Sequence, residues 1–181
     1  MDKRTIANQE AKQKIITAFF SLLKKKRFSE ITVTDIIKTA GVARATYYRN
    51  FDVKENIIEE YLNTCRKQMK PILVDENFSS ETLAYENLVI RLKQISAQKE
   101  NLLLLCQNGF TDFLHEESNR FAEIILGDMP IHSIERYNIY IVSGALLNLM
   151  IQWVKNDCAE SPEEMAKLIA EKIPILFQDF S

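Results

Sequence analysis

The segment Ile31–Ile57, ITVTDIIKTAGVARATYYRNFDVKENI, decides the fold of this chain. Its first part predicts a short helix over residues 33–40, because apolar residues recur there at the spacing of one helix face. Thr32 and Asp35 resemble a capping box at the start of this helix, with Asp in place of the usual Glu. Gly41 supplies the permissive backbone that a sharp turn needs, so a second short helix is expected directly after it. Two short helices around a tight turn predict a helix-turn-helix.

The second helix, expected over residues 43–50, carries few apolar side chains and many hydrogen-bond donors. Tyr47 is expected to face the core and Phe51 to pack beside it. Tyr48 is expected on the outer face, with ordinary packing as the alternative. A short helix with polar, aromatic and cationic outer residues is typical of the helix that reads DNA bases.

This pattern resembles the DNA-binding domain of the TetR family of transcriptional regulators, and the resemblance covers roughly residues 9–60. Ten positions match the family's usual string in register: Thr32, Ile36, Ala40, Gly41, Val42, Thr46, Tyr48, Phe51, Lys54 and Glu55. The chain departs from that string in three places: Ile37 replaces a small residue, Ala43 replaces the capping serine, and Ile57 replaces leucine. Val53 also fills a position that a small polar cap often takes. None of these departures removes a phosphate donor, and Asp52 is a candidate for the cap that Val53 cannot supply.

The resemblance implies an all-α protein with an N-terminal three-helix helix-turn-helix domain and a C-terminal helical ligand-binding and dimerisation domain. We expect the first domain over residues 1–53 and the second over 54–181, with a helix from residue 54 connecting them. The resemblance also implies a homodimeric regulator, more often a repressor, that binds a palindromic operator and is released by a small-molecule effector. Two alternatives remain open: a regulator that answers to a protein partner, and an interaction module that does not bind DNA.

DNA contacts can be carried over from the family position by position. The resemblance assigns contacts to the sugar-phosphate backbone to Thr32, Thr46, Arg49, Asn50 and Lys54. It assigns contacts to base edges to Thr34, Arg44, Ala45 and Tyr48. Arg44 is the strongest candidate for direct readout, because a guanidinium can pair bidentately with guanine, and Ala45 could meet a thymine methyl group.

The charge of the chain is divided along its length. Residues 1–54 hold 12 Lys+Arg and 5 Asp+Glu, a net charge of +7, whereas residues 55–181 hold 11 and 20, a net charge of −9. A basic head on an acidic body predicts a polyanionic partner for the head alone. The run Lys24–Arg27 fits either a phosphate-facing patch or a solvated helix end, where cations also suit the helix dipole.

Composition restricts the remaining classes of protein. Four glycines and four prolines in 181 residues favour long helices. The three cysteines show neither metal-ligand spacing nor a disulfide framework, which fits a reducing cytoplasm. The amino end has no apolar signal core, and the apolar run over residues 139–151 is shorter than a membrane span. Because the sequence contains no phosphate loop, nucleophile elbow or metal cluster, we expect no enzyme, cofactor or metal site.

Helices are expected over most of the chain: residues 9–26, 54–70, 80–98, 102–126, 134–155 and 161–177, with a break near 108–109. The last two are expected to pair with their copies in a dimer. The candidate interface residues are Ile141, Ala145, Leu149, Met165, Leu168, Ile169 and Leu176. The alternative is a buried central helix in a monomer.

A ligand pocket, if there is one, is expected between about residues 60 and 155. The candidate lining residues are Phe110, Phe113, Phe121, Tyr137, Tyr140 and Trp153. Each of them could instead be an ordinary core residue. Nothing in this half of the sequence identifies an effector.

Overall fold

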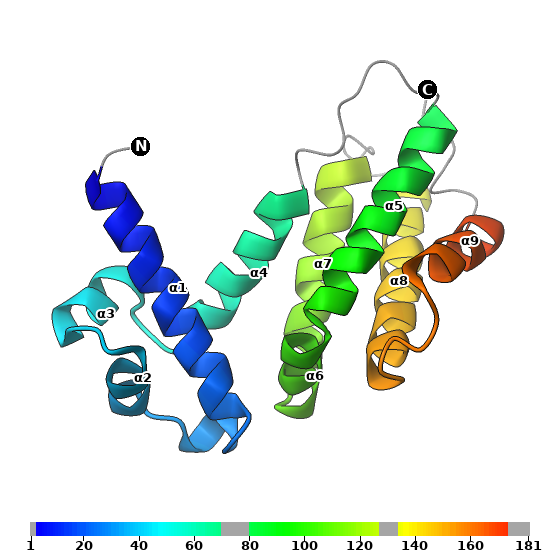
Figure 1. Ribbon diagram of the computed structural model, residues 1–181. Helices are drawn as coiled ribbons and strands as arrows, with labels where there is room; N and C mark the ends of the chain where they lie inside the picture. Colours follow the sequence, from blue (N-terminus) through cyan, green and yellow to red (C-terminus); the bar gives the residue numbers. More distant parts are fainter. Residues whose placement is uncertain (1–2, 70–79, 127–133, 174–181) are drawn as a thin grey trace. The chain divides into compact units, whose positions relative to one another are not determined.

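The computed structural model describes residues 3–69, 80–126 and 134–173, and all regular elements in these ranges are helices (Figure 1). This confirms the all-α class that the sequence predicted. Contacts divide the chain into two compact units, Met1–Pro71 and Ile72–Ser181. The functional boundary expected after residue 53 stays a prediction.

The first unit contains α1 (Lys3–Leu23), η1 (Phe28–Glu30), α2 (Val33–Ala40), α3 (Arg44–Asn50) and α4 (Asn56–Met69). Helix α1 begins at Lys3, six residues before the expected start, because no glycine or proline interrupts residues 3–9. It ends at Leu23, just before the basic run, whose first residues form a turn.

One apolar core holds the helices of the first unit together. Phe19 and Phe20 of α1 meet edge to face with their ring centroids 5.4 Å apart, and Phe20 lies 4.6 Å from the ring of Tyr61 on α4. An ion pair between Lys12 and Glu60, 2.9 Å long, joins the same two helices outside the core. The core also holds buried residues from the other elements: Ile15, Ile16, Leu23, Ile31, Ile36, Tyr47, Phe51, Ile57 and Ile58.

The second unit contains α5 (Ser80–Ala97), α6 (Lys99–Gln107), α7 (Thr111–Leu126), η3 (Ile134–Arg136), α8 (Tyr137–Lys155) and α9 (Pro162–Lys172). The break expected near residues 108–109 is confirmed, since Gly109 has a φ of 86° between α6 and α7. The serine cap expected for the last helix is also present: Ser161 Oγ accepts a hydrogen bond from the Glu164 N–H at 3.2 Å.

Helices α5, α8 and α9 enclose one core cluster of the second unit, formed by Leu92, Trp153, Met165, Ala166 and Ile169. Two contacts show that helices α7 and α8 run antiparallel. Ser143 of α8 bonds to Asn119 of α7, whereas Tyr140, earlier in α8, bonds to Glu123, later in α7. Ser143 Oγ donates to Asn119 Oδ1 at 2.8 Å, and the Tyr140 hydroxyl donates to Glu123 Oε1 at 2.8 Å.

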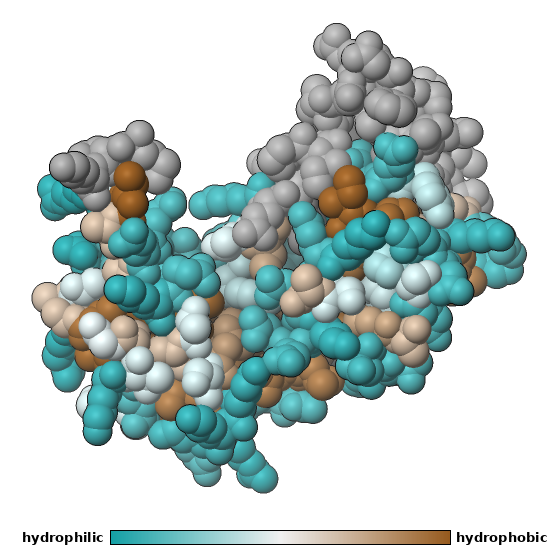
Figure 2. All heavy atoms as spheres, in the orientation of Figure 1, coloured by the Kyte–Doolittle hydropathy of each residue, from teal (hydrophilic) through white to brown (hydrophobic). Residues whose placement is uncertain are grey.

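Helix α8 is long and apolar enough to cross a membrane by length and composition alone. The apolar run expected to be too short is therefore part of a 19-residue helix. For one helix alone, length and composition are weak evidence of a membrane span, because core helices of soluble proteins can have the same length and composition. On the face drawn in Figure 2, hydrophilic residues dominate the described surface and apolar residues are scattered among them.

Candidate nucleic-acid interface

Helix α2 begins with the complete capping box that the sequence predicted. The Asp35 N–H donates to Thr32 Oγ1 at 3.1 Å, and the Thr32 N–H donates to Asp35 Oδ2 at 2.9 Å. The same carboxylate oxygen also accepts from the Thr32 hydroxyl at 2.8 Å and from Lys26 Nζ at 2.9 Å. These bonds, the backbone N–H of Thr32 first among them, hold the pKa of Asp35 well below its usual range.

The capping box bears on the phosphate contact expected from Thr32. A threonine hydroxyl has one proton to donate, and Thr32 gives it to Asp35. The hydroxyl would have to rotate away from the carboxylate before it could donate to a phosphate. The expected contact of Thr32 stays a prediction. Thr34, the exposed second residue of α2, has no such competing bond among the described contacts.

The turn between α2 and α3 depends on the backbone of Gly41. This residue closes α2 with a φ of 63°, and its N–H donates to the Ile37 carbonyl. A Cβ at this position would meet no atom within 4 Å. The need for glycine is therefore conformational and not a matter of space.

Helix α3 has a buried face and an exposed face, as expected for a recognition helix. Tyr47 is fully buried, which raises its pKa to about 12, and Phe51 is buried beside it with the ring centroids 5.9 Å apart. The inward placement of Tyr47 and the packing of Phe51 are confirmed. The exposed side chains of the helix are Arg44, Ala45, Tyr48 and Arg49.

One side chain expected to contact the DNA backbone, Asn50, is partly occupied within α3. Asn50 Nδ2 donates to the Thr46 carbonyl at 2.8 Å, and both residues are half-buried. One amide hydrogen of Asn50 remains for another acceptor, since the side chain carries two. Ala43 precedes the helix without a side-chain cap. The departure from serine noted in the sequence therefore leaves the first turn of α3 without a hydroxyl partner.

Lys54 is held inside the first unit. Its ammonium donates to the carbonyl oxygens of Phe28 at 2.7 Å and Ile31 at 2.9 Å, and it lies 4.1 Å from the ring centroid of Phe28. An ammonium has three donors, so one remains for a phosphate. Sequence reasoning gave Lys54 only the phosphate role. It missed the bonds to Phe28 and Ile31, because backbone carbonyls more than 20 residues away leave no local signal.

The basic run before α2 is divided between structural and exposed roles. Lys26 forms the ion pair with Asp35, and the Arg27 backbone N–H donates to Glu30 Oε2 at 3.0 Å. Lys25 is exposed. The run therefore serves partly to fix the start of α2, a role that neither reading of the sequence included, and its contact with phosphate stays a prediction.

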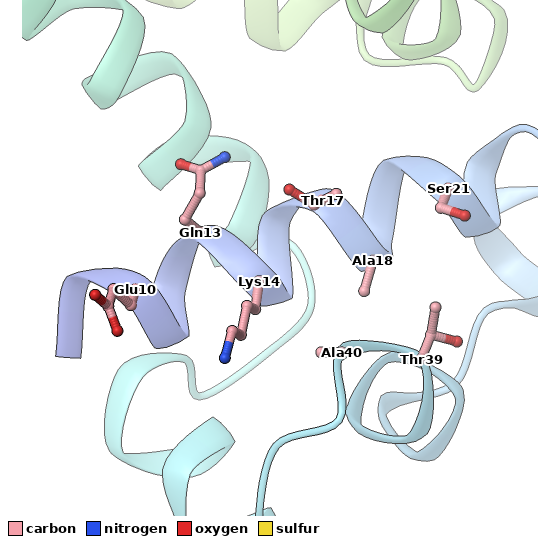
Figure 3. A pocket seen from close by; sticks show the side chains of 8 residues that line it. All are labelled: Glu10, Gln13, Lys14, Thr17, Ala18, Ser21, Thr39 and Ala40. Carbon is pink, nitrogen blue, oxygen red and sulfur yellow. The ribbon is translucent and has the colours of Figure 1, made fainter. Parts of the chain in front are cut away.

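A surface groove lies in the first unit along α1 and the end of α2 (Figure 3). Its lining residues are Glu10, Gln13, Lys14, Thr17, Ala18, Ser21, Thr39 and Ala40. Ala18 points toward Thr39 and Ala40, whereas Gln13 and Thr17 point to the other side of α1 in this view. None of the residues expected to line a ligand pocket borders this groove.

The described residues do not bring the candidate pocket residues together. Tyr140 pairs with Glu123 near the end of α7, whereas Phe110 and Phe113 lie at its beginning. Tyr140 and Trp153 are separated along α8 by about 20 Å at the usual rise of a helix. Trp153 is buried in the core and donates its indole N–H to the Glu160 carbonyl at 3.1 Å. The Phe121 side chain lies outside the described part of the chain.

The candidate interface residues divide into buried and exposed groups. Met165 and Ile169 are buried in the core of their own unit, and Leu149 packs against that core. Their burial leaves no surface of Met165 or Ile169 for a partner. Ile141 is 67% exposed, Leu168 is 40% exposed, and Ala145 is also exposed. Leu176 lies outside the described residues.

The described residues contain no group of three or more His, Cys, Asp or Glu side chains that could hold a metal ion. All three cysteines are free.

A family model described as a transcriptional regulator C-terminal region, TetR_C_8, matches residues 92–174. An uncharacterized HTH-type transcriptional regulator of Bacillus subtilis (strain 168), YxbF, is 23% identical over 172 residues, which cover 92% of this chain. The chain spans only 44% of the length of that relative.

Solved structures share the fold over nearly the whole chain. A TetR transcriptional regulator from Streptococcus agalactiae 2603V has a TM-score of 0.62 at 20% identity, covering 97% of this chain and 98% of its own. NalD, described as the secondary repressor of the MexAB-OprM multidrug efflux pump in Pseudomonas aeruginosa, has a TM-score of 0.56 at 19% identity, covering 96% and 98%. The dihydroxyacetone kinase operon activator DhaS has a TM-score of 0.59 at 15% identity, covering 92% and 96%.

The second unit is thus similar to the C-terminal region of TetR-type transcriptional regulators over residues 92–174, and the chain is similar to an HTH-type transcriptional regulator over 92% of its length. The solved structures show that nearly the whole chain shares the fold of TetR-family regulators.

Proposed function

We propose that this chain represses transcription as a homodimer that binds a palindromic operator, and that a small-molecule effector releases it. The observation that carries the proposal is the exposed face of α3. Arg44, Ala45, Tyr48 and Arg49 are exposed there, while Tyr47 and Phe51 anchor the opposite face in the core. A recognition helix needs both faces, because base contacts require a rigid support.

Electrostatics support DNA as the ligand of this face. Residues 1–54 carry a net charge of +7. Each phosphate that such a unit neutralises releases counterions. A plot of the logarithm of the binding constant against the logarithm of the salt concentration therefore has a slope of roughly −0.9 for each phosphate contact. We place Thr34, Arg44, Ala45, Tyr48 and Arg49 at the DNA without rearrangement. Thr32, Thr46, Asn50 and Lys54 would add contacts while keeping or exchanging the intramolecular bonds described above.

We propose that the dimer forms through α8 and α9. Tyr137, Ile141 and Ala145 are exposed at a spacing of four residues, so they share one face of α8, and Leu168 is exposed on α9. Exposed apolar side chains along one face need a cover. A second copy supplies the same face by two-fold symmetry. The two recognition helices would then address successive major grooves about 34 Å apart.

The sign of regulation differs between the proteins that share this fold. DhaS is described as an activator and NalD as a repressor, so the fold is compatible with either sign. We propose repression, with release by a small molecule bound in the second unit of a cytoplasmic protein. Release by a protein partner is the alternative.

Selection of bound duplexes from a random pool tests the proposal. The full chain should enrich a palindrome whose half-sites lie about one helical turn apart. Transcription in vitro from a promoter that overlaps the recovered sequence should fall as protein is added. No enrichment over scrambled competitor at moderate salt would contradict DNA recognition, and increased transcription would contradict repression.

A further inference from the structure

The exposed face of α3 contains one side-chain pair with a defined geometry. Arg44 Nη2 donates to the Tyr48 hydroxyl at 3.3 Å, and the guanidinium carbon lies 5.3 Å from the centroid of the Tyr48 ring. The two residues are four positions apart and so share one face of the helix. A hydrogen bond and a cation–π contact together narrow the directions that the guanidinium can take.

Tyr48 is itself supported from the core. Its ring meets the Tyr47 ring edge to face with the centroids 5.3 Å apart, and Tyr47 contacts Phe51 in turn. Tyr47 and Phe51 are both buried, whereas Tyr48 is 44% exposed. A line of aromatic contacts therefore leads from the fixed interior of the first unit to Arg44 at its surface.

The pairing with Tyr48 leaves Arg44 able to read a base. A guanidinium has five N–H donors, and a bidentate contact with O6 and N7 of guanine uses two of them. One donor goes to Tyr48, so both contacts can exist at once. The Tyr48 hydroxyl accepts from Arg44 and retains its own O–H for an acceptor on the DNA.

We infer that Tyr48 is a positioning residue for Arg44, and that it restrains the guanidinium for bidentate recognition of one guanine in each operator half-site. This inference rests on the proposed DNA-binding function and names the base and the residue that sets its readout. A free arginine side chain loses rotamer freedom when it binds. Restraint before binding reduces that loss and favours the one geometry that fits guanine.

The experiment uses the full chain and the operator recovered by selection. Arg44→Ala first identifies the guanine whose preference is lost. That guanine is then replaced by 7-deazaguanine, which lacks the N7 acceptor. The wild-type chain should bind the substituted duplex about tenfold more weakly than the unmodified one, and Arg44→Ala should bind the two equally.

Tyr48→Phe is the variant that tests the positioning role, because it removes the hydroxyl and keeps the ring. It should lower the ratio of the affinities for the unmodified and the 7-deazaguanine duplex by about threefold, the effect of one ordinary hydrogen bond. We call this ratio the discrimination. The salt slope should not change, because the hydroxyl carries no charge. Tyr47→Phe is the matched control: it makes the same change at the neighbouring residue, whose buried hydroxyl has no partner in the described structure. It should keep the wild-type discrimination.

Unchanged discrimination in Tyr48→Phe would overturn the inference, and so would stronger discrimination, which would mean that the pair competes with DNA. If Arg44→Ala costs no guanine preference at any position, the inference also fails. A chain that enriches no duplex at all contradicts the proposed function instead, so the two failures are distinguishable.

Discussion

The ammonium of Lys54 donates to the carbonyl oxygen of Phe28 at 2.7 Å and lies 4.1 Å from the centroid of that residue's ring. A second bond reaches the carbonyl of Ile31. Lys54 precedes α4, whereas Phe28 and Ile31 lie within the link between α1 and α2, at the two ends of η1. One cation therefore fixes the start of α4 against the segment that leads into the helix-turn-helix.

Replacing Lys54 with methionine should lower the free energy of unfolding by about 1–3 kcal/mol, because two half-buried carbonyls lose a charged donor. Chemical denaturation measures this change. Lys25→Met is the control, since it removes the same charge from an exposed position and should have little effect on stability. Equal stability of the two variants would show that the bonds of Lys54 contribute nothing.

The same variant tests the phosphate contact expected from the sequence. If the third donor of Lys54 binds a phosphate, Lys54→Met should weaken binding to every DNA sequence and lower the salt slope by about one contact. An unchanged salt slope, measured under conditions in which the variant is folded, would leave Lys54 with a structural role alone.

Arg44 and Arg49 offer a comparison of base and backbone contacts on one helix. Arg44→Ala should cost about 1–3 kcal/mol on the selected operator and relax preference at one position. Arg49→Ala should weaken binding to all sequences alike. Binding titrations on the operator and on a scrambled duplex separate these effects. A uniform loss for Arg44→Ala would place its guanidinium on phosphate.

Local signals in the sequence predicted the helix starts and turns of the helix-turn-helix better than they predicted the partners of individual side chains. The capping box of Thr32 and Asp35 and the turn at Gly41 depend on residues within one turn of helix, so the sequence contains their cause. Lys54 and Trp153 find carbonyl partners through the tertiary fold. Their bonds could not be predicted from spacing.

The dimer face illustrates a second limit of sequence patterns. Apolar residues at helical spacing show that a face is covered, but not which chain covers it. Met165 and Ile169 fit the expected interface by spacing, yet the core of their own unit buries them. Ile141 has the same apolar character and is 67% exposed. Only the packing of α5 against α9 distinguishes the two cases.

Ile141→Lys should therefore produce folded monomers, since the substituted side chain can remain in water in the absence of a partner. Sedimentation equilibrium measures the change, and circular dichroism verifies the fold. A charge at Leu149 would be less informative, because that residue packs against the core of its own unit. Ile90→Lys, on an exposed position of α5, is the control and should leave the mass unchanged. A dimer of normal affinity in Ile141→Lys would exclude this face of α8 from the interface.

Asp35 should make the stability of the first unit depend on pH in the acidic range. The pKa of its carboxyl is lowered in the folded chain by the backbone N–H of Thr32, by Lys26 and by the Thr32 hydroxyl. The ionised form is thus favoured by folding, so its contribution to stability is present above the ordinary aspartate pKa of about 3.9 and is lost as pH falls below it.

Asp35→Asn should lower the melting temperature at pH 7, and the difference from wild type should shrink as the pH falls below about 4. Asp52→Asn, which removes an exposed carboxylate from the same unit, is the control. A constant difference between Asp35→Asn and wild type from pH 7 into the acid range would mean that the capping geometry, and not the charge of Asp35, stabilises the start of α2.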